Sequence, residues 1–538
     1  MIDDPDKVFL LDGIRNGFNL VDDNAMPLEA DCSNYASTTD SSVKLVVEEQ
    51  ILNEISNGNY VLTDKRPTLV SALGAIPKPN SNDVRLIHDC SRPIGTSLND
   101  FATKDSVKYQ TIEEAVNLSN VDCFYSKIDL KSAYRSVAIH PSNYSFTGLK
   151  WKFVDHDSFT YMYDTKLPFG ARKSPAIFHR LTQAVRRMMA RRGFYGIVVY
   201  LDDFLIVSSS FEQCRETMQV LIQLLRKLGF AINWKKVEDP NKIVTFLGIE
   251  FNSTNLSLSL PDNKVKDLKA LLNEFSDRKR ASKRQLQSLA GRLNWACHVV
   301  RGGRTYLRRV LDAMNRMKLP HHKAKLSDTF HKDILWWINC LDTFNGRNMF
   351  LKPTCSTPVY VDACNTGAGM AFGRDWAYIN WVEDWPEIAP MHINFKEALT
   401  VVAAARRWGH LWHNSHIIIL TDSECTKAML NKGTTKNELV MDHIRELFWL
   451  SVKFNFEFEC VHIRGVDNTL SDAISRLHEK GRFLQLEAIL MDYCLDPLHP
   501  LALRLHMSTK AIHTLLFQII VWLQRKWSWI KKYLTIDP

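Results

Sequence analysis

The sequence lacks the features of secreted, membrane-spanning and metal-stapled proteins. Its eleven cysteines form no Cys-x-x-Cys pair, which disfavours a zinc site or a disulfide framework and favours reduced thiols in an intracellular protein. It has no window of about 18 apolar residues, so we expect no transmembrane helix and no membrane partner. The acidic N-terminus lacks the basic and apolar regions of a signal peptide. We therefore predict a protein of the cytoplasm, the nucleus or both, and not a secreted one.

The composition is that of a globular protein with one unusually basic region. Hydrophobic residues make up 45% and charged residues 24% of the 538 residues, which excludes a mostly disordered or collagenous chain and suggests about three or four domains. The net charge is +9, and fourteen Lys and Arg against two acidic residues lie between Ser276 and Leu326. Such a run is often only a solvated helix face, but phosphate-binding proteins also carry one. Trp295 and Tyr306 lie within it, which favours nucleic acid binding.

Periodicity and composition divide the chain into five segments. We expect an acidic flexible leader at 1–42, an alternating α and β region at 43–260, a basic helical region at 261–350, a second β-then-α unit at 356–478 and a helical tail at 479–538. The tail mixes bulky apolar residues with Lys and Arg. A packed or partner-binding helix is the simpler interpretation of the tail, and a membrane-surface helix is the alternative.

Three acidic residues of the first α and β region follow hydrophobic strands. The run GIVVYLDDFLIV predicts a hairpin with Asp202 and Asp203 at its tip, and FYSKID predicts a strand that ends at Asp129. An Asp-Asp pair at a tight turn is commonly a surface feature. Here both flanks are apolar enough to be buried, and burying carboxylates without a partner is costly. Three carboxylates at one sheet edge can hold two Mg²⁺ roughly 4 Å apart for displacement at phosphorus.

Four acidic residues of the second unit have a specific order. Asp362 ends the strand TPVYVD, Glu397 lies in an amphipathic helix for which Asn394 is the expected N-cap, and Asp422 ends the strand HIIILTD. Asp472 lies near the start of the last helix of this unit. Any one of them alone is more often a cap or surface residue. Two acids at strand ends and two on helices suit a nuclease with two metal ions.

The first set of acids resembles the palm of reverse transcriptases. The resemblance implies that Asp129 and Asp202 are the main metal ligands and Asp203 a supporting one. It also implies that Tyr134 is a steric gate against ribonucleotides, although a core aromatic is the alternative. LPFGARKSPAIF resembles the loop and helix behind the nucleotide, with Phe169 and Gly170 as contacts; retroviral enzymes have Gln at the position of Phe169.

Flanking motifs extend this resemblance to the fingers and thumb. IPKPNSNDVRLIHDCSRP resembles the fingers, where Lys78 and Arg85 would grip the triphosphate. In LGFAINWKK, Lys236, or with less support Lys235, would donate a proton to pyrophosphate. LAGRLNWA resembles the thumb helix of retroviral enzymes. The resemblance implies that Gly291, Arg292 and Trp295 would contact the minor groove of the bound duplex.

The second set of acids resembles ribonuclease H over about 359–477. The resemblance implies that Asp362, Glu397, Asp422 and Asp472 are its metal ligands. Many members carry a mobile His shortly before the last Asp, whereas this chain has Ile463 there and His462 one residue earlier. We expect activity without that His, as in gypsy-like elements, and assign His462 no catalytic role.

Together, the two resemblances imply a fold and a function, namely RNA- and DNA-directed DNA synthesis with cleavage of RNA:DNA hybrids by a retrotransposon enzyme. The expected fold class is a multidomain α+β protein, a right-hand polymerase of fingers, palm and thumb followed by an RNase H-like α/β domain. Its partners would be an RNA template, a DNA primer, RNA:DNA hybrid and dNTPs, and its cofactor Mg²⁺, two ions per active site, with Mn²⁺ as a substitute. The oligomeric state stays open.

Further motifs resemble one group of retroelements. VFLLDGIRNGF and HDCSRPIGTSLNDF are similar to DIRS/Ngaro-like tyrosine-recombinase retrotransposons, with a gypsy-like origin as the runner-up. We expect no recombinase after Asp472, and hence a fragment, a truncated copy or a host-retained gene. A non-catalytic nucleic-acid-binding derivative is the alternative function, although all seven acids are present. A membrane- or partner-binding role through Ile519–Leu534 is a third.

Overall fold

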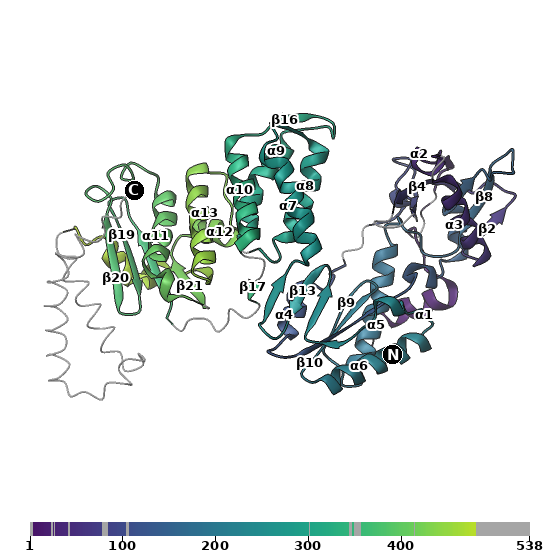
Figure 1. Cartoon of the computed structure of the whole chain (residues 1–538), viewed down its shortest axis with the longest axis horizontal. Helices are drawn as coiled ribbons and strands as arrows, with labels where there is room; N and C mark the ends of the chain where they lie inside the picture. Colours follow the sequence, from purple (N-terminus) through teal and green to yellow (C-terminus); the bar gives the residue numbers. More distant parts are fainter. Residues whose placement is uncertain are drawn as a thin grey trace. The chain divides into compact units, whose positions relative to one another are not determined.

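The chain divides into two compact units, 1–257 and 258–538 (Figure 1). A computed structural model describes residues 4–22, 25, 27–40, 43–77, 84–103, 107–300, 302–343, 347–348, 357–413 and 415–479. The expected helical tail at 479–538 and the triphosphate residue Lys78 lie outside these residues, except for Glu479. No helix within the described ranges has both the length and the hydropathy needed to cross a membrane.

The first unit contains a five-stranded sheet, a separate hairpin and a four-stranded sheet that carries the first set of acids, here called the acidic sheet. The five-stranded sheet has the order β1-β3-β7-β8-β2, and its strands are β1 (Ala30–Asp31), β3 (Leu69–Val70), β7 (Gly148–Trp151), β8 (Thr160–Asp164) and β2 (Tyr60–Thr63). The hairpin consists of β4 (Ala72–Pro77) and β5 (Val84–Asp89). Helix α3 (Lys44–Ser56) buries Val47 and Ile51 in the core that β2, β4 and β8 share.

A four-stranded sheet of order β11-β6-β10-β9 carries the first set of acids. Its strands are β11 (Glu238–Asn241), β6 (Phe124–Asp129), β10 (Asp203–Ser208) and β9 (Ile197–Tyr200). The apolar side chains of β9 and β10 are buried with those of two long helices, α5 (Ser174–Ala190) and α6 (Phe211–Lys227). Burial of these apolar runs fixes the strands, so that the acids at their ends occupy set positions. This unit also contains α2 (Ala36–Thr39), α4 (Ile112–Leu118), β12 (Ile243–Phe246) and β13 (Ile249–Asn252).

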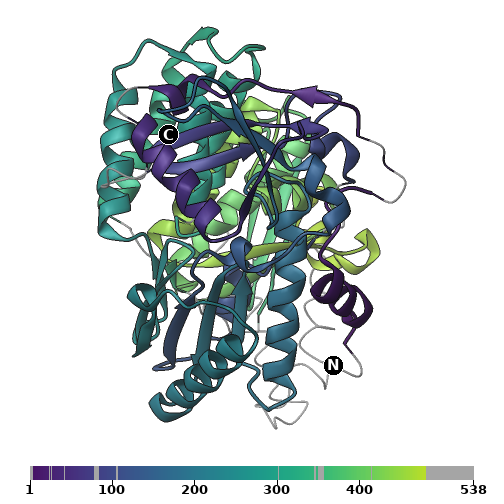
Figure 2. The same ribbon diagram turned by 90° about the vertical axis from the view of Figure 1, so that its right-hand side faces the viewer.

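The N-terminal residues differ from the expected flexible leader. Residues 4–22, here called the N-terminal strap, contain helix α1 (Lys7–Asn16), which lies beside α5 (Figures 1 and 2). Phe18, Leu20 and Val21 are buried in the same core as the acidic sheet. The acidic and polar composition suggested a solvated segment, whereas Asp4 and Asp6 pair with Arg187 of α5, a partner far away in the chain.

The second unit begins with helices that carry the basic run. These helices are α7 (Asp262–Ser276), α8 (Lys283–Ala296), α9 (Gly303–Asn315) and α10 (Asp328–Thr343). Two short strands, β15 (Arg280–Ser282) and β16 (Lys323–Lys325), pair antiparallel beside them. The strand β14 (Ser257–Ser259) spans the boundary of the two units, and β17 (Arg347–Asn348) follows α10.

A five-stranded sheet of order β20-β19-β18-β21-β22 carries the second set of acids. Its strands are β18 (Val359–Ala363), β19 (Gly367–Phe372), β20 (Asp375–Asn380), β21 (His416–Thr421) and β22 (Glu457–His462), and its helices are α11 (Ile393–Trp408), α12 (Glu424–Lys432), α13 (Glu438–Lys453) and α14 (Thr469–Ser475). Strand β21 pairs parallel with both β18 and β22. The carboxyl ends of β18 and β21 therefore meet at one sheet edge.

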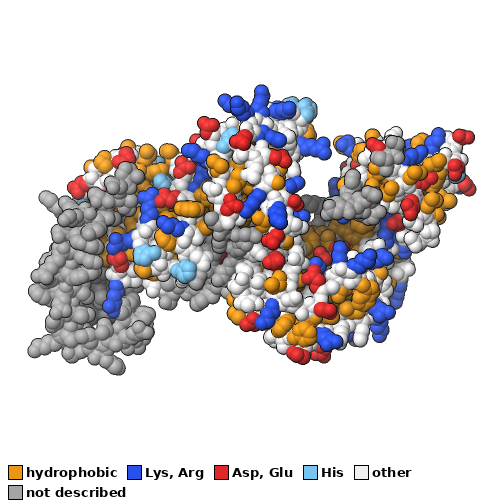
Figure 3. Space-filling model, viewed as in Figure 1, with side chains coloured by type: hydrophobic (Ala, Val, Ile, Leu, Met, Phe, Trp, Pro, Cys, Tyr) orange, Lys and Arg blue, Asp and Glu red, His pale blue; other side chains and the backbone are white. Residues whose placement is uncertain are grey.

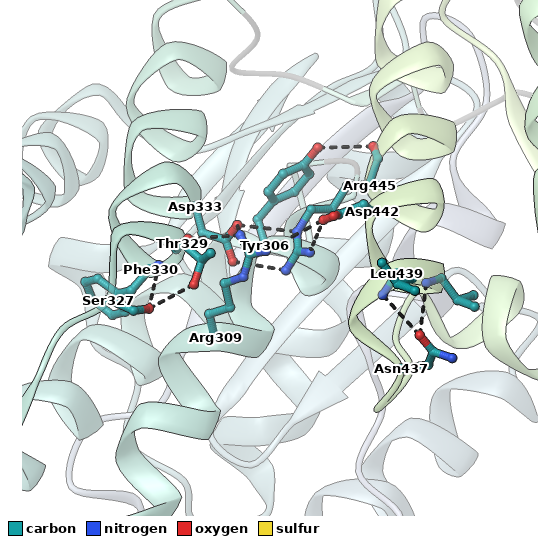
Figure 4. A network of polar contacts seen from close by, with 11 residues as sticks. Tyr306, Arg309, Ser327, Thr329, Phe330, Asp333, Asn437, Leu439, Asp442 and Arg445 are labelled. Atoms are coloured by element: carbon teal, nitrogen blue, oxygen red, sulfur yellow. Dashed lines mark hydrogen bonds and ion pairs between the residues drawn. The ribbon is translucent and has the colours of Figure 1, made fainter. Parts of the chain in front are cut away.

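A buried ionic cluster joins α9 and α10 to α13 (Figure 4). Arg309 Nη1 lies 2.9 Å from Asp333 Oδ1, and Arg445 Nη2 lies 3.4 Å from Asp333 Oδ2. The Tyr306 hydroxyl donates to the carbonyl of Arg445 at 3.1 Å, and its ring stacks on Trp336. Because Asp333 is only 1% exposed, loss of an arginine would leave its charge poorly compensated, at a cost of about 3–5 kcal/mol.

Candidate active sites

The three acids of the first unit meet at one edge of the acidic sheet. Asp203 is the cross-strand partner of both Asp129 and Tyr200, and Asp202 lies in the turn between β9 and β10. The backbone N–H of Leu130 donates to the carbonyl of Asp202 at 3.1 Å, which fastens the turn to the end of β6. Asp129 and the tip of the β9–β10 hairpin are therefore next to each other, as expected from the strands that end there.

Two side chains from the segment before β11 bind Asp129. The Asn233 amide donates to Asp129 Oδ1 at 2.8 Å, and Lys236 Nζ lies 3.0 Å from Asp129 Oδ2. Lys236 belongs to the short 3-10 helix Trp234–Lys236, which the backbone N–H of Asn233 anchors to the carbonyl of Asp129 at 2.9 Å. Of the two lysines considered as proton donors, Lys236 is the one that contacts the acidic edge.

The acidic edge is electrostatically strained in a way that a cation would relieve. Burial, followed by repulsion from Asp202 and Asp129, raises the pKa of Asp203 to about 6. Burial also raises the pKa of Asp202, with a further contribution from Asp129 and an opposing one from Lys236. Carboxylates that repel one another at a partly buried edge are suited to share a divalent cation.

A cluster of aromatic side chains adjoins the acidic edge. Tyr134 stacks on Phe169 with ring centroids 4.9 Å apart and tilts against Phe178 at 5.4 Å. Burial, and to a smaller extent the charge of Asp202, raises the pKa of Tyr134. Phe169 is 43% exposed, so the Tyr134–Phe169 pair has one open side. Both the gate and the core interpretation of Tyr134 predicted aromatic contacts, and its nearness to Asp202 suits the gate.

Gly170 lies where only glycine fits. Its φ is +133°, and a Cβ would lie 2.1 Å from the carbonyl oxygen of His88. The buried Asn99 donates its amide to the Gly170 carbonyl at 2.9 Å and accepts from the backbone N–H of Arg172 at 2.6 Å. The loop that carries Phe169 and Gly170 is therefore held against β5 and the turn after it.

The remaining polymerase-type residues lie on exposed surfaces. Arg85 is an exposed residue of β5 and pairs with Ile76. Gly291, Arg292 and Trp295 are exposed on α8, and nothing lies within 4 Å of where a Gly291 Cβ would be. Figure 3 shows Lys and Arg side chains gathered around β16, and exposed basic residues there include Lys279, Arg280, Lys323 and Lys325.

The acids of the second unit converge around β18. Asp362 faces Gly369 across the β18–β19 ladder, and a Cβ at Gly369 would lie 2.3 Å from the carbonyl oxygen of Ser471. This glycine lets α14 approach the sheet closely, and the hydroxyl of Ser475 donates to Asp362 Oδ2 at 2.6 Å. Burial, then repulsion by Asp422 and Asp472, outweighs this bond and raises the pKa of Asp362 to about 6.

Glu397 and Asp472 complete this set from two helices. The Thr426 hydroxyl donates to Glu397 Oε2 at 2.9 Å, and burial with a contribution from Asp422 raises the pKa of Glu397. Arg476 Nε donates to Asp472 Oδ1 at 2.7 Å. The expected N-cap Asn394 was wrong: α11 begins at Ile393, and His392 is its N-cap, with a ring nitrogen that accepts from the backbone N–H of Asn394.

The loop without the mobile histidine follows β22. Ile463 donates its backbone N–H to the carbonyl of Thr421 at 3.0 Å, next to Asp422. His462 ends β22, with Nδ1 3.4 Å from Glu424 Oε1. His462 thus contacts an acid outside the set of four, which agrees with assigning it no catalytic role.

Both acidic sets have the donor chemistry of a divalent-metal site. In each set, burial and repulsion by two neighbouring carboxylates raise the pKa of one carboxyl, Asp203 in the first and Asp362 in the second. Hard oxygen ligands such as these are those that Mg²⁺ prefers. Within the described ranges, no group of three or more His, Cys, Asp or Glu side chains is arranged so that it could hold a metal ion. Polar side chains bind three of these carboxylates instead: Lys236 and Asn233 bind Asp129, Ser475 binds Asp362 and Arg476 binds Asp472.

Sequence reasoning missed four residues that hold these carboxylates. Asn233 lies three residues before Lys236, and Ser475 and Arg476 follow Asp472 by three and four residues. Helical spacing from Asp472 was a usable signal for the last two. Thr426 had no such signal, because it reaches Glu397 from a different helix.

Comparison with known proteins assigns the segment around the first site to a family. Residues 76–251 match the family model described as "Reverse transcriptase (RNA-dependent DNA polymerase)". These residues belong to the reverse transcriptase family. The matched range contains Asp129, Asp202 and Asp203 together with the stacked pair of Tyr134 and Phe169, so the segment similar to reverse transcriptases carries the first acidic set.

Curated relatives of the chain are viral polyproteins. The Gag-Pol polyprotein of Gibbon ape leukemia virus is 28% identical over 189 residues, which cover 35% of this chain and 11% of the polyprotein. The Enzymatic polyprotein of Cauliflower mosaic virus is 23% identical over 394 residues, which cover 69% of this chain and 54% of the polyprotein. The chain thus spans between about a tenth and about half of these relatives.

Solved structures confirm the predicted fold class. The foamy viral protease-reverse transcriptase in complex with dsDNA has 15% sequence identity and a TM-score of 0.52, covering 83% of this chain and 87% of that one. The same foamy viral protein in complex with RNA/DNA hybrid has 16% identity and a TM-score of 0.52, covering 82% of this chain and 56% of that one. The reverse transcriptase domain thus belongs to a multidomain α+β fold.

Proposed function

We propose that this chain is an RNA- and DNA-directed DNA polymerase that also cleaves the RNA strand of RNA:DNA hybrids. The observation that carries the polymerase is the pairing of Asp129 with Asp203 beside Asp202, inside the segment that matches the reverse transcriptase family. The nuclease is supported by Asp362, whose carboxyl is repelled by both Asp422 and Asp472. The foamy viral complexes support duplex DNA and RNA:DNA hybrid as partners.

In the polymerase, side chains would position the nucleotide and balance charge. Mg²⁺ bound by Asp129, Asp202 and Asp203, two ions with Mn²⁺ as a substitute, would neutralise charge that develops on phosphate oxygens. Tyr134 and Phe169 would hold the sugar, with the Tyr134 ring excluding a 2′-hydroxyl. Lys236, released from Asp129, would donate a proton to the departing pyrophosphate, while Arg85 and Lys78 grip the triphosphate.

In the nuclease, four carboxylates would hold the metal ions at the scissile phosphate. Asp362 and Asp422 come from strand ends, and Glu397 and Asp472 come from helices. Ser475 orients Asp362, and Thr426 orients Glu397 through the bonds described above. The RNA:DNA duplex would lie along Gly291, Arg292 and Trp295 on its way to this site. These residues would contact the backbone of the duplex and not its bases.

Primer extension on poly(rA)/oligo(dT) with Mg²⁺ or Mn²⁺ tests the polymerase. Wild type should extend the primer, and Asp202→Asn should not, because its neutral amide is a poor metal ligand. Asp239→Asn, which changes an exposed acid of β11 in the same sheet, is the matched control and should extend normally. Wild-type extension that persists in Asp202→Asn would refute the proposed site.

The DIRS/Ngaro-like origin remains part of this proposal. It rests on the N-terminal and fingers motifs, and part of the former lies in the buried N-terminal strap. A non-catalytic nucleic-acid-binding derivative is the second candidate, favoured by the exposed basic residues around β16. Binding without metal-dependent extension or cleavage would favour that candidate.

A further inference from the structure

The N-terminal strap is fastened at both ends of helix α5. Near the carboxyl end of the helix, Arg187 Nη2 lies 2.7 Å from Asp4 Oδ1 and 2.8 Å from Asp6 Oδ2. The guanidinium of Arg180 lies 3.6 Å from the ring centroid of Phe9. The side chain of Asp4 has no exposed area, so breaking its contact with Arg187 would leave a buried charge without its partner.

The strap ends at the start of the same helix. Lys173 Nζ lies 2.6 Å from Asp22 Oδ1 and donates to the carbonyl of Val21 at 3.1 Å. Asp22 also accepts from Thr103, at 2.7 Å from the backbone N–H and 3.1 Å from the hydroxyl. The bond from Lys173 holds the pKa of Asp22 below its usual range, so that the carboxylate stays charged near neutral pH.

Asp22 therefore links the two segments that shape the nucleotide pocket. Thr103 follows the 3-10 helix Leu98–Phe101, whose Asn99 binds Gly170 and Arg172. The guanidinium of Arg172 donates to the carbonyl of Ala102 at 2.7 Å. Gly170 is the neighbour of Phe169, which stacks on Tyr134. A continuous chain of polar contacts thus runs from Asp22 to the loop beneath the expected sugar position.

We propose that the N-terminal strap is a positioning element of the nucleotide pocket and that Asp22 is the residue through which it fixes the loop from Phe169 to Lys173. This inference rests on the proposed polymerase function. Asp22 touches no reacting group; it holds the loop so that Phe169 and Tyr134 stay stacked. A misplacement of about 1 Å in a group that positions the substrate can cost on the order of a hundredfold in efficiency, even when the change lies away from the reacting atoms.

Steady-state kinetics of single-nucleotide incorporation by the full chain test this role. Asp22→Ala should raise the KM for dNTP on the order of tenfold, with kcat within about twofold. Asp22→Asn keeps an acceptor for Thr103 but loses the ion pair with Lys173, so its KM should lie between. Asp12→Ala removes an exposed acid of α1 that bonds only locally to Asn16 in the described contacts, and it should behave as wild type.

Denaturant unfolding of each variant, followed by far-UV circular dichroism, serves as the measure of folded protein, because it reports on the unit that contains Asp22. An unchanged KM in Asp22→Ala would overturn the proposal, as would a lower kcat at unchanged KM, which is the sign of lost folded enzyme. If wild type does not extend a primer, the polymerase itself is wrong and the role of Asp22 falls with it. Failure of the strap alone is thus distinguishable, because extension then continues normally in Asp22→Ala.

Discussion

At the scale of single residues, the same pattern recurs in both acidic sets. Burial and two neighbouring carboxylates raise the pKa of one carboxyl in each set, Asp203 or Asp362. A neighbouring cation, Lys236 or Arg476, binds another carboxylate of the same set. Such arrangements are unfavourable for folding and suited to metal binding, which is the common relation between stability and function at active sites. Both consequences can be measured.

Replacing Asp362 should stabilise the metal-free protein. Its folded pKa is raised from 3.8 to about 6, so its favourable contribution is complete below pH 3.8 and is lost as the pH rises through 6. In EDTA, Asp362→Asn should therefore stabilise the second unit at pH 8 by up to about 3 kcal/mol, and much less at pH 5. Denaturant unfolding followed by tryptophan fluorescence measures this.

Asp467→Asn is the control for that experiment. Arg464 lowers the pKa of the exposed Asp467 by a hydrogen bond, so the change should have the opposite sign and be small. A loss of stability in Asp362→Asn at pH 8 would show that its carboxylate is not under electrostatic strain.

Tyr134 should govern the choice of sugar. Its ring stacks on Phe169 near Asp202, so Tyr134→Val would open space for a 2′-hydroxyl without moving the metal ligands. We expect ribonucleotide incorporation relative to deoxynucleotide incorporation to rise on the order of a hundredfold, or about 2–3 kcal/mol. Single-nucleotide extension with matched rNTP and dNTP measures this ratio, and unchanged selectivity would make Tyr134 only a core aromatic.

At the scale of elements, helices and strands present these residues on defined surfaces. Helix α8 buries Leu286, Leu289 and Leu293 and exposes Gly291, Arg292 and Trp295. The apolar face of this amphipathic helix is thus packed in the protein, and the opposite face is exposed where a duplex could bind.

Arg292 and Trp295 should contribute to duplex binding in different ways. Arg292→Ala should weaken binding and reduce the slope of log K against log salt by about one, because one phosphate contact is lost. Trp295→Ala should weaken binding without changing that slope. Fluorescence anisotropy across a salt series separates the two, with Arg374→Ala, an exposed arginine between β19 and β20, as control. Identical slopes for Arg292→Ala and wild type would contradict the phosphate contact.

The sequence predicted the elements that obey local rules. Apolar strands that end in an acid located Asp129, Asp362 and Asp422, because burial of the strand fixes where its end lies. Contacts between distant segments were not predictable in this way. Asp22 and Lys173 are 151 residues apart, and nothing near Asp22 in the sequence identifies a partner. For this reason the sequence predicted a flexible leader at 1–42, although residues 4–22 pack against α5.

At the scale of the whole molecule, the chain combines two acidic sets in separate compact units. The first lies in 1–257 and the second in 258–538. The helices with the basic run belong to the second unit, and the cluster of Arg309, Asp333 and Arg445 joins them to α13. Since the two sets share no residues, each proposed activity should survive loss of the other.

The most direct test follows extension and cleavage on one template-primer, with the RNA and the DNA labelled separately. Wild type should perform both reactions. Asp202→Asn should stop extension and leave cleavage of preformed hybrid intact, and Asp422→Asn should do the reverse. If either substitution removed both activities from a folded protein, two independent metal sites could not be the basis of its function.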